Sequence, residues 1–271
     1  MIIGNRNFSD NRTYIMGILN VTPDSFSDGG RHNTLTNALL HTEKMIEEGA
    51  DVIDVGGEST RPGYVRICDD EEIRRVVPII EEIKKRFDVA ISVDTYKSTV
   101  AKAAIESGAD LINDIWGLKY DSNMAKVIKD YNASCCLMHN RNNMDYNSFI
   151  DDVIADIKES LDIAYSSGIP KNKILIDPGV GFAKSYEQNL EVVNNLHRLH
   201  SLGVPVLLGT SRKSVIGLAL DLPADERLEG TLATTVFAVM KGCRFVRVHD
   251  VKENKRVITM TERILYGTNQ N

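Results

Sequence analysis

The feature that most constrains the fold is a unit that recurs along the chain: an apolar run, a polar residue where it ends, a loop and a helical pattern. In the first unit, the run that begins at Met16 ends at Asn20, and a polar loop from Thr22 to Gly30 follows. Pro23 cannot donate to a sheet ladder, so the strand should end before it. A run without polar residues predicts a strand that is buried on both faces.

Eight such alternations can be counted if the segment after Asp250 forms the last helix. The apolar runs lie at residues 16–19, 52–55, 89–93, 111–112, 133–138, 174–176, 204–208 and 245–248. Eight units in 271 residues, without a linker rich in Pro, Gly or Ser, predict an α/β fold that closes as a single (β/α)8 TIM barrel. We expect a hairpin or cap at residues 1–14, the barrel at 15–266 and a tail at 267–271. The alternative is an open doubly wound sheet, which would more often carry G-x-G-x-x-G after its first strand, and none stands there.

Charge and composition narrow the function classes. A formal net charge of −6 argues against a general binder of nucleic acid or of anionic membranes, so a basic site would have to be local. No apolar run approaches the ~18 residues of a membrane span, and the N-terminus lacks the pattern of a secretion signal. The cysteines, which form no C-x-x-C pair, favour reduced thiols, and we expect a soluble cytoplasmic protein. They are Cys68, Cys135, Cys136 and Cys243.

Polar residues stand where the apolar runs end. In a barrel every strand opens on the same face, so these residues should converge although they are far apart in the sequence. They are Asn20, Glu58 to Arg61, Asp94, Asn113, Met138, Asp177, Lys213, Arg247 and His249. The set offers carboxylates and amides for a small polar heterocycle and cations for an anion, but no Cys/His cluster with transition-metal spacing. It fits phosphate chemistry better than zinc chemistry.

A cationic group is expected at the seventh and eighth strands, which is the usual phosphate corner of such barrels. The backbone N–H groups of GTSRKS and the Lys213 side chain can hold an anion, and Arg247 and His249 share a face by period-two spacing. The alternative is that Arg212 and Lys213 are merely solvated loop charges. Asn20 alone is a weak signal, but beside a phosphate it suits Mg²⁺, which takes few protein oxygens when a substrate supplies the rest.

Two carboxylates, Asp94 and Asp177, each end a hydrophobic run, where a charged group needs partners. Each can have a purely structural role, as a helix cap or as an acceptor of loop N–H groups. With Asn113 on the same rim, they also match a planar ring that presents adjacent amino and N–H donors. Asp54 inside its strand and Glu58 just beyond are interpreted as structural or supporting residues.

Eight motifs together carry a resemblance to a known family. NVTPDSFSDGG, GGESTRPG, SVDTYK, NDIWG, DPGVGFAK, LLGTSRKS, EGT and RVHDV stand in the order of the dihydropteroate synthase family of the folate pathway, and the match covers nearly the whole chain. The resemblance implies a transferase that joins p-aminobenzoate to 6-hydroxymethyl-7,8-dihydropterin diphosphate, releasing 7,8-dihydropteroate and pyrophosphate with Mg²⁺. It also implies a homodimer and competition by sulfonamides for the aminobenzoate site.

The resemblance further implies a role for individual residues. The pterin pocket would consist of Asp94, Asn113, Asp177 and Lys213, with Ile115 and Met138 lining the ring. Asn20 would hold Mg²⁺, and Arg61, Arg247 and His249 would bind the diphosphate. The aminobenzoate would lie against Thr60, Pro62, Phe182, Lys213 and Ser214. Phe26 and Asp28 would contribute from the loop at 22–31, which with the loop at 58–65 would close over the site. Trp116 departs from the smaller residue that the family leads us to expect.

The chemistry expected from these residues makes departure of the leaving group the difficult step of the reaction. An arylamine is neutral at pH 7, so the nucleophile needs no general base, and the sequence offers no Ser/His or Cys/His pair. Mg²⁺ with Arg247, His249 and Asn20 would take up charge on the departing pyrophosphate, and Asp94 would stabilise positive charge on the pterin. The rival interpretations are a methyltetrahydrofolate-type methyltransferase and a non-catalytic pterin binder.

Overall fold

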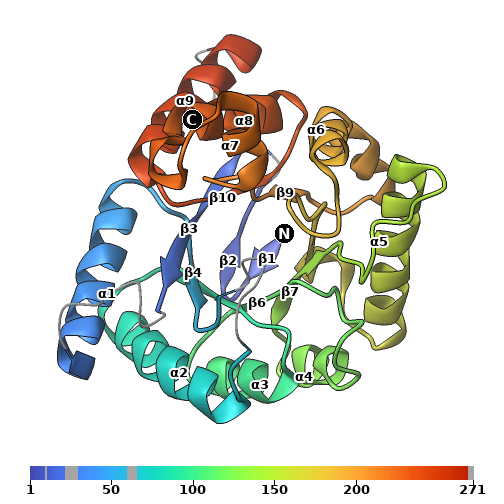
Figure 1. Cartoon of the computed structure of the whole chain (residues 1–271). Coiled ribbons are helices and arrows are strands. Elements are labelled where there is room, and N and C mark those ends of the chain that lie inside the picture. Colours follow the sequence, from blue (N-terminus) through green and yellow to red (C-terminus); the bar gives the residue numbers. More distant parts are fainter. Residues whose placement is uncertain (10, 22–29, 60–65, 268–271) are drawn as a thin grey trace.

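Eight parallel strands form a closed barrel in the computed structural model, which describes residues 1–9, 11–21, 30–59 and 66–267 (Figure 1). Neighbouring strands pair in the order β8-β7-β6-β5-β4-β3-β10-β9. A parallel bridge between Ile176 and Val206 joins the two ends of this series, and the Ile176 amide donates to the Pro205 carbonyl at 3.0 Å. The strands are β3 (Tyr14–Asn20), β4 (Val52–Gly56), β5 (Ala90–Asp94), β6 (Leu111–Asp114), β7 (Ser134–Met138), β8 (Ile174–Asp177), β9 (Leu207–Leu208) and β10 (Phe245–Val248). The predicted barrel is confirmed.

Helices surround the strands on the outside of the barrel, as Figure 1 shows. Their apolar faces pack on the outward-facing strand residues, which produces the larger of the buried apolar clusters. The α-helices are α1 (Gly30–Glu47), α2 (Asp69–Arg86), α3 (Ser98–Glu106), α4 (Met124–Asp130), α5 (Phe149–Ser166), α6 (Tyr186–Asn194), α7 (Ser214–Leu220), α8 (Leu228–Met240) and α9 (Val251–Tyr266). In the described part of the chain, the 3₁₀ segments η2 (Lys171–Lys173), η3 (Leu196–Leu202) and η4 (Ala224–Glu226) lie between them.

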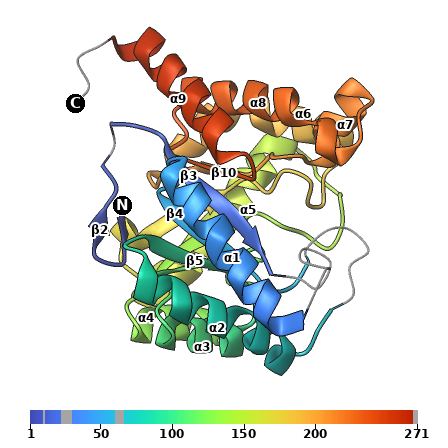
Figure 2. The ribbon, with the colours of Figure 1, turned by 90° about the vertical axis from the view of Figure 1, so that its left-hand side faces the viewer.

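The predicted N-terminal hairpin closes the end of the barrel where the strands begin (Figure 2). Its strands β1 (Ile2–Ile3) and β2 (Arg6–Asn7) are antiparallel. The Phe8 ring packs against Tyr14 and Phe245, with centroid distances of 4.9 and 5.4 Å. These aromatic residues belong to an apolar cluster that also contains Met16, so hydrophobic side chains fill the barrel interior at the end where the strands begin.

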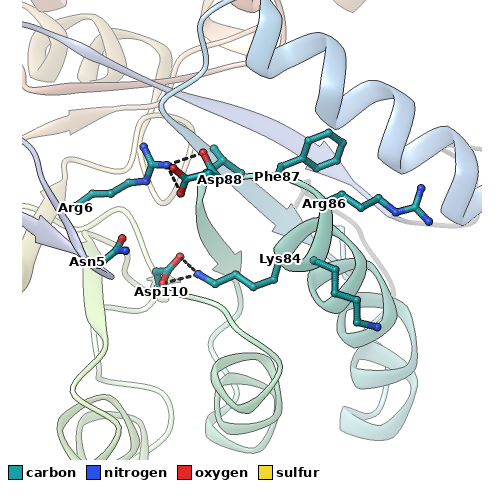
Figure 3. Close-up of a pocket in the computed structure, with 9 residues that line it drawn as sticks. Asn5, Arg6, Lys84, Arg86, Phe87, Asp88 and Asp110 are labelled. Carbon is teal, nitrogen blue, oxygen red and sulfur yellow. Dashed lines mark hydrogen bonds and ion pairs between the residues drawn. The ribbon is translucent and has the colours of Figure 1, made fainter.

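Ion pairs fasten the hairpin and the neighbouring loops at this end of the molecule. Figure 3 shows Arg6 paired with Asp88 at 2.6 Å, and Lys84 paired with Asp110 at 3.1 Å. The pocket that they line has a volume of about 320 Å³. Because each of these cations already has a carboxylate partner and the strand ends open at the opposite end, this pocket is part of the closure of the barrel floor.

Candidate active site at the carboxyl ends of the strands

Strand register places the end residues of four neighbouring strands, β3 to β6, at one level. Asn20 pairs with Gly56, Gly56 with Asp94, and Asp94 with Asn113. A Cβ atom built on Gly56 would lie 3.4 Å from the Asn20 Oδ1 atom and 3.8 Å from the Asp94 Cβ atom. Asn20 and Asp94 therefore flank Gly56 on the same side of the strands, and the missing side chain leaves room between them.

Arg247 links two carboxylates from neighbouring strands. Its Nε atom donates to Asp54 at 2.6 Å and its Nη2 atom donates to Asp94 at 2.8 Å. Asp54 also accepts from Ser92 at 2.5 Å and from Asn113 at 3.2 Å. The sequence suggested a supporting role for Asp54, and in the structure this fully buried carboxylate is the common acceptor of three side chains.

Asp94 is the residue whose hydrogen bonding is incomplete. One of its oxygens accepts from Arg247, while Oδ1 is buried and has no partner among the described residues. Burial raises the pKa of Asp94 to about 7, because the charged form loses hydration, although the Arg247 charge opposes the shift. A ligand that brings an N–H donor to Oδ1 would complete the hydrogen bonds of this carboxyl group.

Asp177 and Lys213 form the second charged pair of the pocket. The Oδ1 atom of Asp177 accepts from the Gly179 amide at 2.7 Å. Its Oδ2 atom faces Gly209, and a Cβ atom built on that glycine would lie 3.5 Å from it. Burial raises the pKa of Asp177, and the Lys213 charge opposes this rise. Burial also lowers the pKa of Lys213 to about 8, against the attraction of Asp177. Lys213 is thus a half-buried cation that acts on both Asp177 and Asp94, and not a solvated loop charge.

An apolar wall stands beside these charges. Tyr96, Ile115 and Met138 form a buried cluster, and Trp116 and Phe182 pack against it. The Lys213 ammonium lies 4.8 Å from the centre of the Phe182 ring. The three apolar residues predicted from the sequence therefore meet at one place, and Tyr96 and Trp116 belong to the same wall. The Trp116 indole N–H is buried without a partner among the described residues.

The corner at β9 and β10 contains the predicted anion-binding residues. The Nδ1 atom of His249 is 3.0 Å from the Ser211 hydroxyl, which also accepts from the His249 amide at 3.2 Å. Arg212 is paired with Asp250 at the outer edge. Ser214 is the first residue of α7 and its side chain is exposed. Ser211 thereby orients the imidazole, whereas Arg212 is engaged in a structural ion pair.

Some predicted residues lie outside the described part of the chain. They are Phe26, Asp28, Thr60, Arg61 and Pro62. Their roles remain predictions from the resemblance.

The described residues fit a magnesium ion only through Asn20. Within the described ranges, no group of three or more His, Cys, Asp or Glu side chains could hold a metal. The half-exposed Asn20 amide oxygen stands beside the space left by Gly56. One hard oxygen ligand is compatible with Mg²⁺ if phosphate oxygens and water supply the other positions.

Beside the apolar wall lies a second pocket of about 610 Å³, at the loops that follow β6 and β7. Two of its cations are already paired, since Lys119 contacts Glu159 at 3.0 Å and Arg141 contacts Asp156 at 2.5 Å. The full lining is Arg66, Trp116, Lys119, Tyr120, Asn140, Arg141, Asn142, Asn143, Asp145 and Asp156. The third cation, Arg66, donates to the Tyr120 hydroxyl at 3.1 Å and lies over the Tyr120 ring.

Comparison with known proteins identifies the class to which this barrel and its site belong. The model of the pterin binding enzyme family matches residues 16–249, and the chain belongs to that family. None of the helices in the described ranges combines the length and the apolar character that crossing a bilayer requires.

Within that family the chain belongs to the dihydropteroate synthases, which are transferases of folate synthesis. It is 59% identical over 267 residues to the dihydropteroate synthase of Clostridium beijerinckii, covering 98% of this chain and 99% of the relative. A solved dihydropteroate synthase from Clostridium difficile, obtained in the presence of pteroic acid, superposes with a TM-score of 0.94 at 50% identity, covering 97% of this chain and 100% of that one. The Xanthomonas albilineans enzyme with 4-aminobenzoic acid gives a TM-score of 0.92 at 39% identity, covering 97% and 96%.

Proposed function

We propose that the open end of this barrel joins p-aminobenzoate to 6-hydroxymethyl-7,8-dihydropterin diphosphate and releases 7,8-dihydropteroate and pyrophosphate. The observation that supports this best is the pair of buried carboxyl groups, Asp94 and Asp177, with Lys213 acting on both. A pterin ring presents amino and N–H donors to the carboxylates and an oxo group to the ammonium. The unpartnered Oδ1 atom of Asp94 accepts one of these donors.

The pterin lies between the polar rim and the apolar wall. Asp177 accepts from the amino and N–H edge of the ring, and Lys213 donates near the oxo group and a ring nitrogen. Asn113, which is held by Asp54 at 3.2 Å, adds a donor and an acceptor beside them. Ile115 and Met138 pack on the faces of the ring.

The diphosphate binds at the corner formed by β9 and β10. Arg247 and His249 bind its oxygens together with Arg61. Arg247 keeps its Nε atom on Asp54 and its Nη2 atom on Asp94, and presents its Nη1 atom to the ligand. Asn20 would hold Mg²⁺, which would supply positive charge beside the phosphate oxygens when bound.

The aminobenzoate binds between Phe182 and the start of α7. Its ring packs against Phe182 and its carboxylate interacts with Lys213 and Ser214, and Thr60 and Pro62 complete this part of the site. Sulfonamides, as aromatic amines of similar shape, compete for the same space. Asp28 acts from the loop that precedes α1.

The chain's own residues are arranged for departure of the leaving group. The amine of p-aminobenzoate carries a free electron pair at neutral pH and attacks the methylene carbon of the pterin without a general base. As the CH₂–O bond breaks, Arg247 and His249 stabilise the negative charge of the departing pyrophosphate. Asp94 lies beside the ring and stabilises the positive charge that spreads from the methylene into the pterin.

Release of pyrophosphate tests this function directly. The chain is mixed with the pterin diphosphate, Mg²⁺ and p-aminobenzoate, and pyrophosphate is measured over time. Release that depends on aminobenzoate supports the proposal, whereas pterin binding without release would favour a non-catalytic binder. A methyltransferase of the related kind would have no use for the diphosphate. If Asp94→Asn kept near-normal turnover while Asp177→Asn abolished it, Asp94 would only bind the ring.

The assembly and the cellular location are also proposals. We infer a homodimer from exposed apolar side chains on consecutive helices, namely Leu218 and Leu220 on α7, Phe237 and Met240 on α8, and Met260, Ile264 and Leu265 on α9. These side chains form a larger apolar group than the single apolar residues that are scattered over an ordinary protein surface, and a second copy of the chain would cover it. Cys135, Cys136 and Cys243 are buried free thiols, which suits a cytoplasmic protein. The barrel at 15–266, with its cap at 1–14, works as one domain.

A further inference from the structure

The loop that follows β8 carries two contacts of the site and has a demanding backbone. Gly179, Gly181 and Ala183 have positive φ angles of 69°, 84° and 45°. A glycine adopts these angles without cost, but at Ala183 the Cβ atom makes them unfavourable. A Cβ atom on Gly179 would also lie 2.0 Å from the His139 carbonyl oxygen. The loop therefore lies tightly against the end of β7 and needs anchors to keep this shape.

Lys184 is the anchor with the most contacts. Its buried ammonium donates to the Gly179 carbonyl at 3.0 Å, to the Phe182 carbonyl at 3.0 Å and to the Nδ1 atom of His139 at 2.7 Å. These three partners use all three N–H groups of the ammonium. The Lys184 side chain alone thus binds the carbonyl groups at both ends of the turn formed by residues 179–182.

His139 is prepared to accept this hydrogen bond. Burial lowers the pKa of His139 to about 4, so the ring is neutral at physiological pH. Its Nε2 atom is 2.9 Å from Asp156, which fixes the proton on Nε2 and leaves the Nδ1 lone pair for Lys184. Arg141 holds the same Asp156 carboxylate through two nitrogens. Asp156, His139 and Lys184 form a chain of hydrogen bonds from α5 to the loop.

The other side of the turn faces the reacting groups. The Val180 carbonyl accepts from the Lys213 ammonium, and the Phe182 ring lies 4.8 Å from the same ammonium. Gly179 donates its amide to Asp177. The carbonyls of the turn thus alternate, with Gly179 and Phe182 directed to Lys184 and Val180 directed to Lys213.

We propose that Lys184 is a positioning residue, which holds the 179–182 turn so that Val180 and Phe182 keep Lys213 directed into the aminobenzoate side of the pocket. This rests on the proposed function for the identity of the substrate. Within the described residues, Asp94 and Asn113 are held by Arg247 and Asp54 and not by the turn, and the side chain of Asp177 contacts the turn through the Gly179 amide. Loss of Lys184 should therefore affect the aminobenzoate more than the pterin.

Substitution Lys184→Met tests this by steady-state kinetics. A displacement of ~1 Å at a substrate-positioning group costs up to ~10²-fold, so the KM for aminobenzoate should rise about tenfold or more, and that for the pterin diphosphate less than about threefold. The control is Lys173→Met, because the Lys173 ammonium also donates to a backbone carbonyl, that of Asn132, at the opposite end of β8. Lys173→Met should leave both KM values unchanged.

A spectroscopic measurement reports on the turn without turnover. Trp116 is the only tryptophan of the chain and packs in the cluster that includes Phe182. In Lys184→Met its emission should shift to longer wavelength and be quenched more strongly by acrylamide, well below the melting temperature. A wild-type chain without turnover would refute the proposed function, while this readout would still test Lys184.

Milder variants keep the proposal testable if Lys184→Met fails to fold. Lys184→Gln keeps two donors and should give a smaller change in the same direction. Tyr146→Phe removes the hydroxyl that donates to the Ala183 carbonyl at 2.9 Å, and it should raise the KM for aminobenzoate selectively. Equal changes in both KM values with unaltered Trp116 emission, or no change in any of them, would overturn the proposal.

Discussion

Substitution Asp54→Ala is expected to affect stability and catalysis together. Asp54 is fully buried and accepts from Arg247 at 2.6 Å, from Ser92 at 2.5 Å and from Asn113 at 3.2 Å. Removing one partner of a buried ion pair costs about 3–5 kcal/mol, because the other charge is left without compensation. Since Arg247 retains Asp94, the lower end of this range applies here, about 3 kcal/mol. At roughly 2–4 °C per kcal/mol for a chain of this size, the melting temperature should fall by about 6–12 °C.

The catalytic effect follows from the freedom that Arg247 gains. Without its Nε partner, the guanidinium turns toward Asp94, and kcat/KM should fall by about 10²-fold. Thermal unfolding followed by circular dichroism measures the first effect, and pyrophosphate release below the melting temperature measures the second. Asp51→Ala is the control, because Asp51 accepts from Arg12 and Ile15 at the opposite end of the barrel. It should lower stability without changing kcat/KM. An Asp54→Ala enzyme with wild-type kcat/KM would refute the role given to Arg247.

The other predictions concern protonation, the metal and the assembly. Burial raises the pKa of Asp94 from 3.8 to about 7, so between these values the native state holds a proton that the unfolded chain releases, and stability falls as pH rises. Urea unfolding at several pH values should show that the difference in free energy of unfolding between wild type and Asp94→Asn grows through that window. If the two free energies changed with pH in parallel, a raised pKa of Asp94 would be excluded. Because the pKa of Lys213 is lowered to about 8, kcat/KM should decline above that pH, and residual activity of Lys213→Arg should lack this decline. Asn20→Ala should raise the Mg²⁺ concentration for half-maximal turnover at least about tenfold, and an unchanged titration would remove Asn20 from the metal site. Met260→Glu combined with Ile264→Glu should convert a dimer into a monomer in sedimentation velocity, whereas a retained dimer would place the interface elsewhere.

The barrel could be predicted from the sequence because its signals are local. Each strand is a short apolar run with a polar residue at its end, and the helices show their own periodicity. The helix of the fourth unit, α4 (Met124–Asp130), was counted but not located from the sequence, since only Met124, Ala125 and Ile128 mark its buried side over two turns. The apolar spacing from Leu190 to Leu199 predicts a single helix, but the structure divides this segment: α6 ends at Asn194, and a 3₁₀ segment continues to Leu202.

The contacts within the site depended on long-range geometry. Period-two spacing and the resemblance named Arg247, but its partner Asp54 lies 193 residues away and was interpreted only as a structural or supporting residue. Lys184 and His139 are 45 residues apart, and neither belongs to a pattern that reveals the other. The available signal was a histidine directly after the apolar run at 133–138 and a lysine at the end of DPGVGFAK, which is not enough to assign a contact between them. Closure of the barrel is what brings such residues together.

The charges inside the barrel explain why the site is ready for a pterin. Five of the charged side chains in the described pocket are the carboxyl groups of Asp54, Asp94 and Asp177 and the cations of Lys213 and Arg247, and these five carry one excess negative charge if all are ionised. Asp54 has the most complete set of donors, and Asp177 has an amide and an ammonium beside it. The excess therefore falls on Asp94, whose pKa is raised to about 7 and whose Oδ1 has no partner within the described ranges. A neutral ring with N–H donors stabilises that charge without adding another, and the positive charge that develops on the ring during the reaction balances it. The excess negative charge and the incomplete hydrogen bonding of Asp94 are unfavourable in the pocket alone. They thereby favour binding of the substrate and, more strongly, of its transition state.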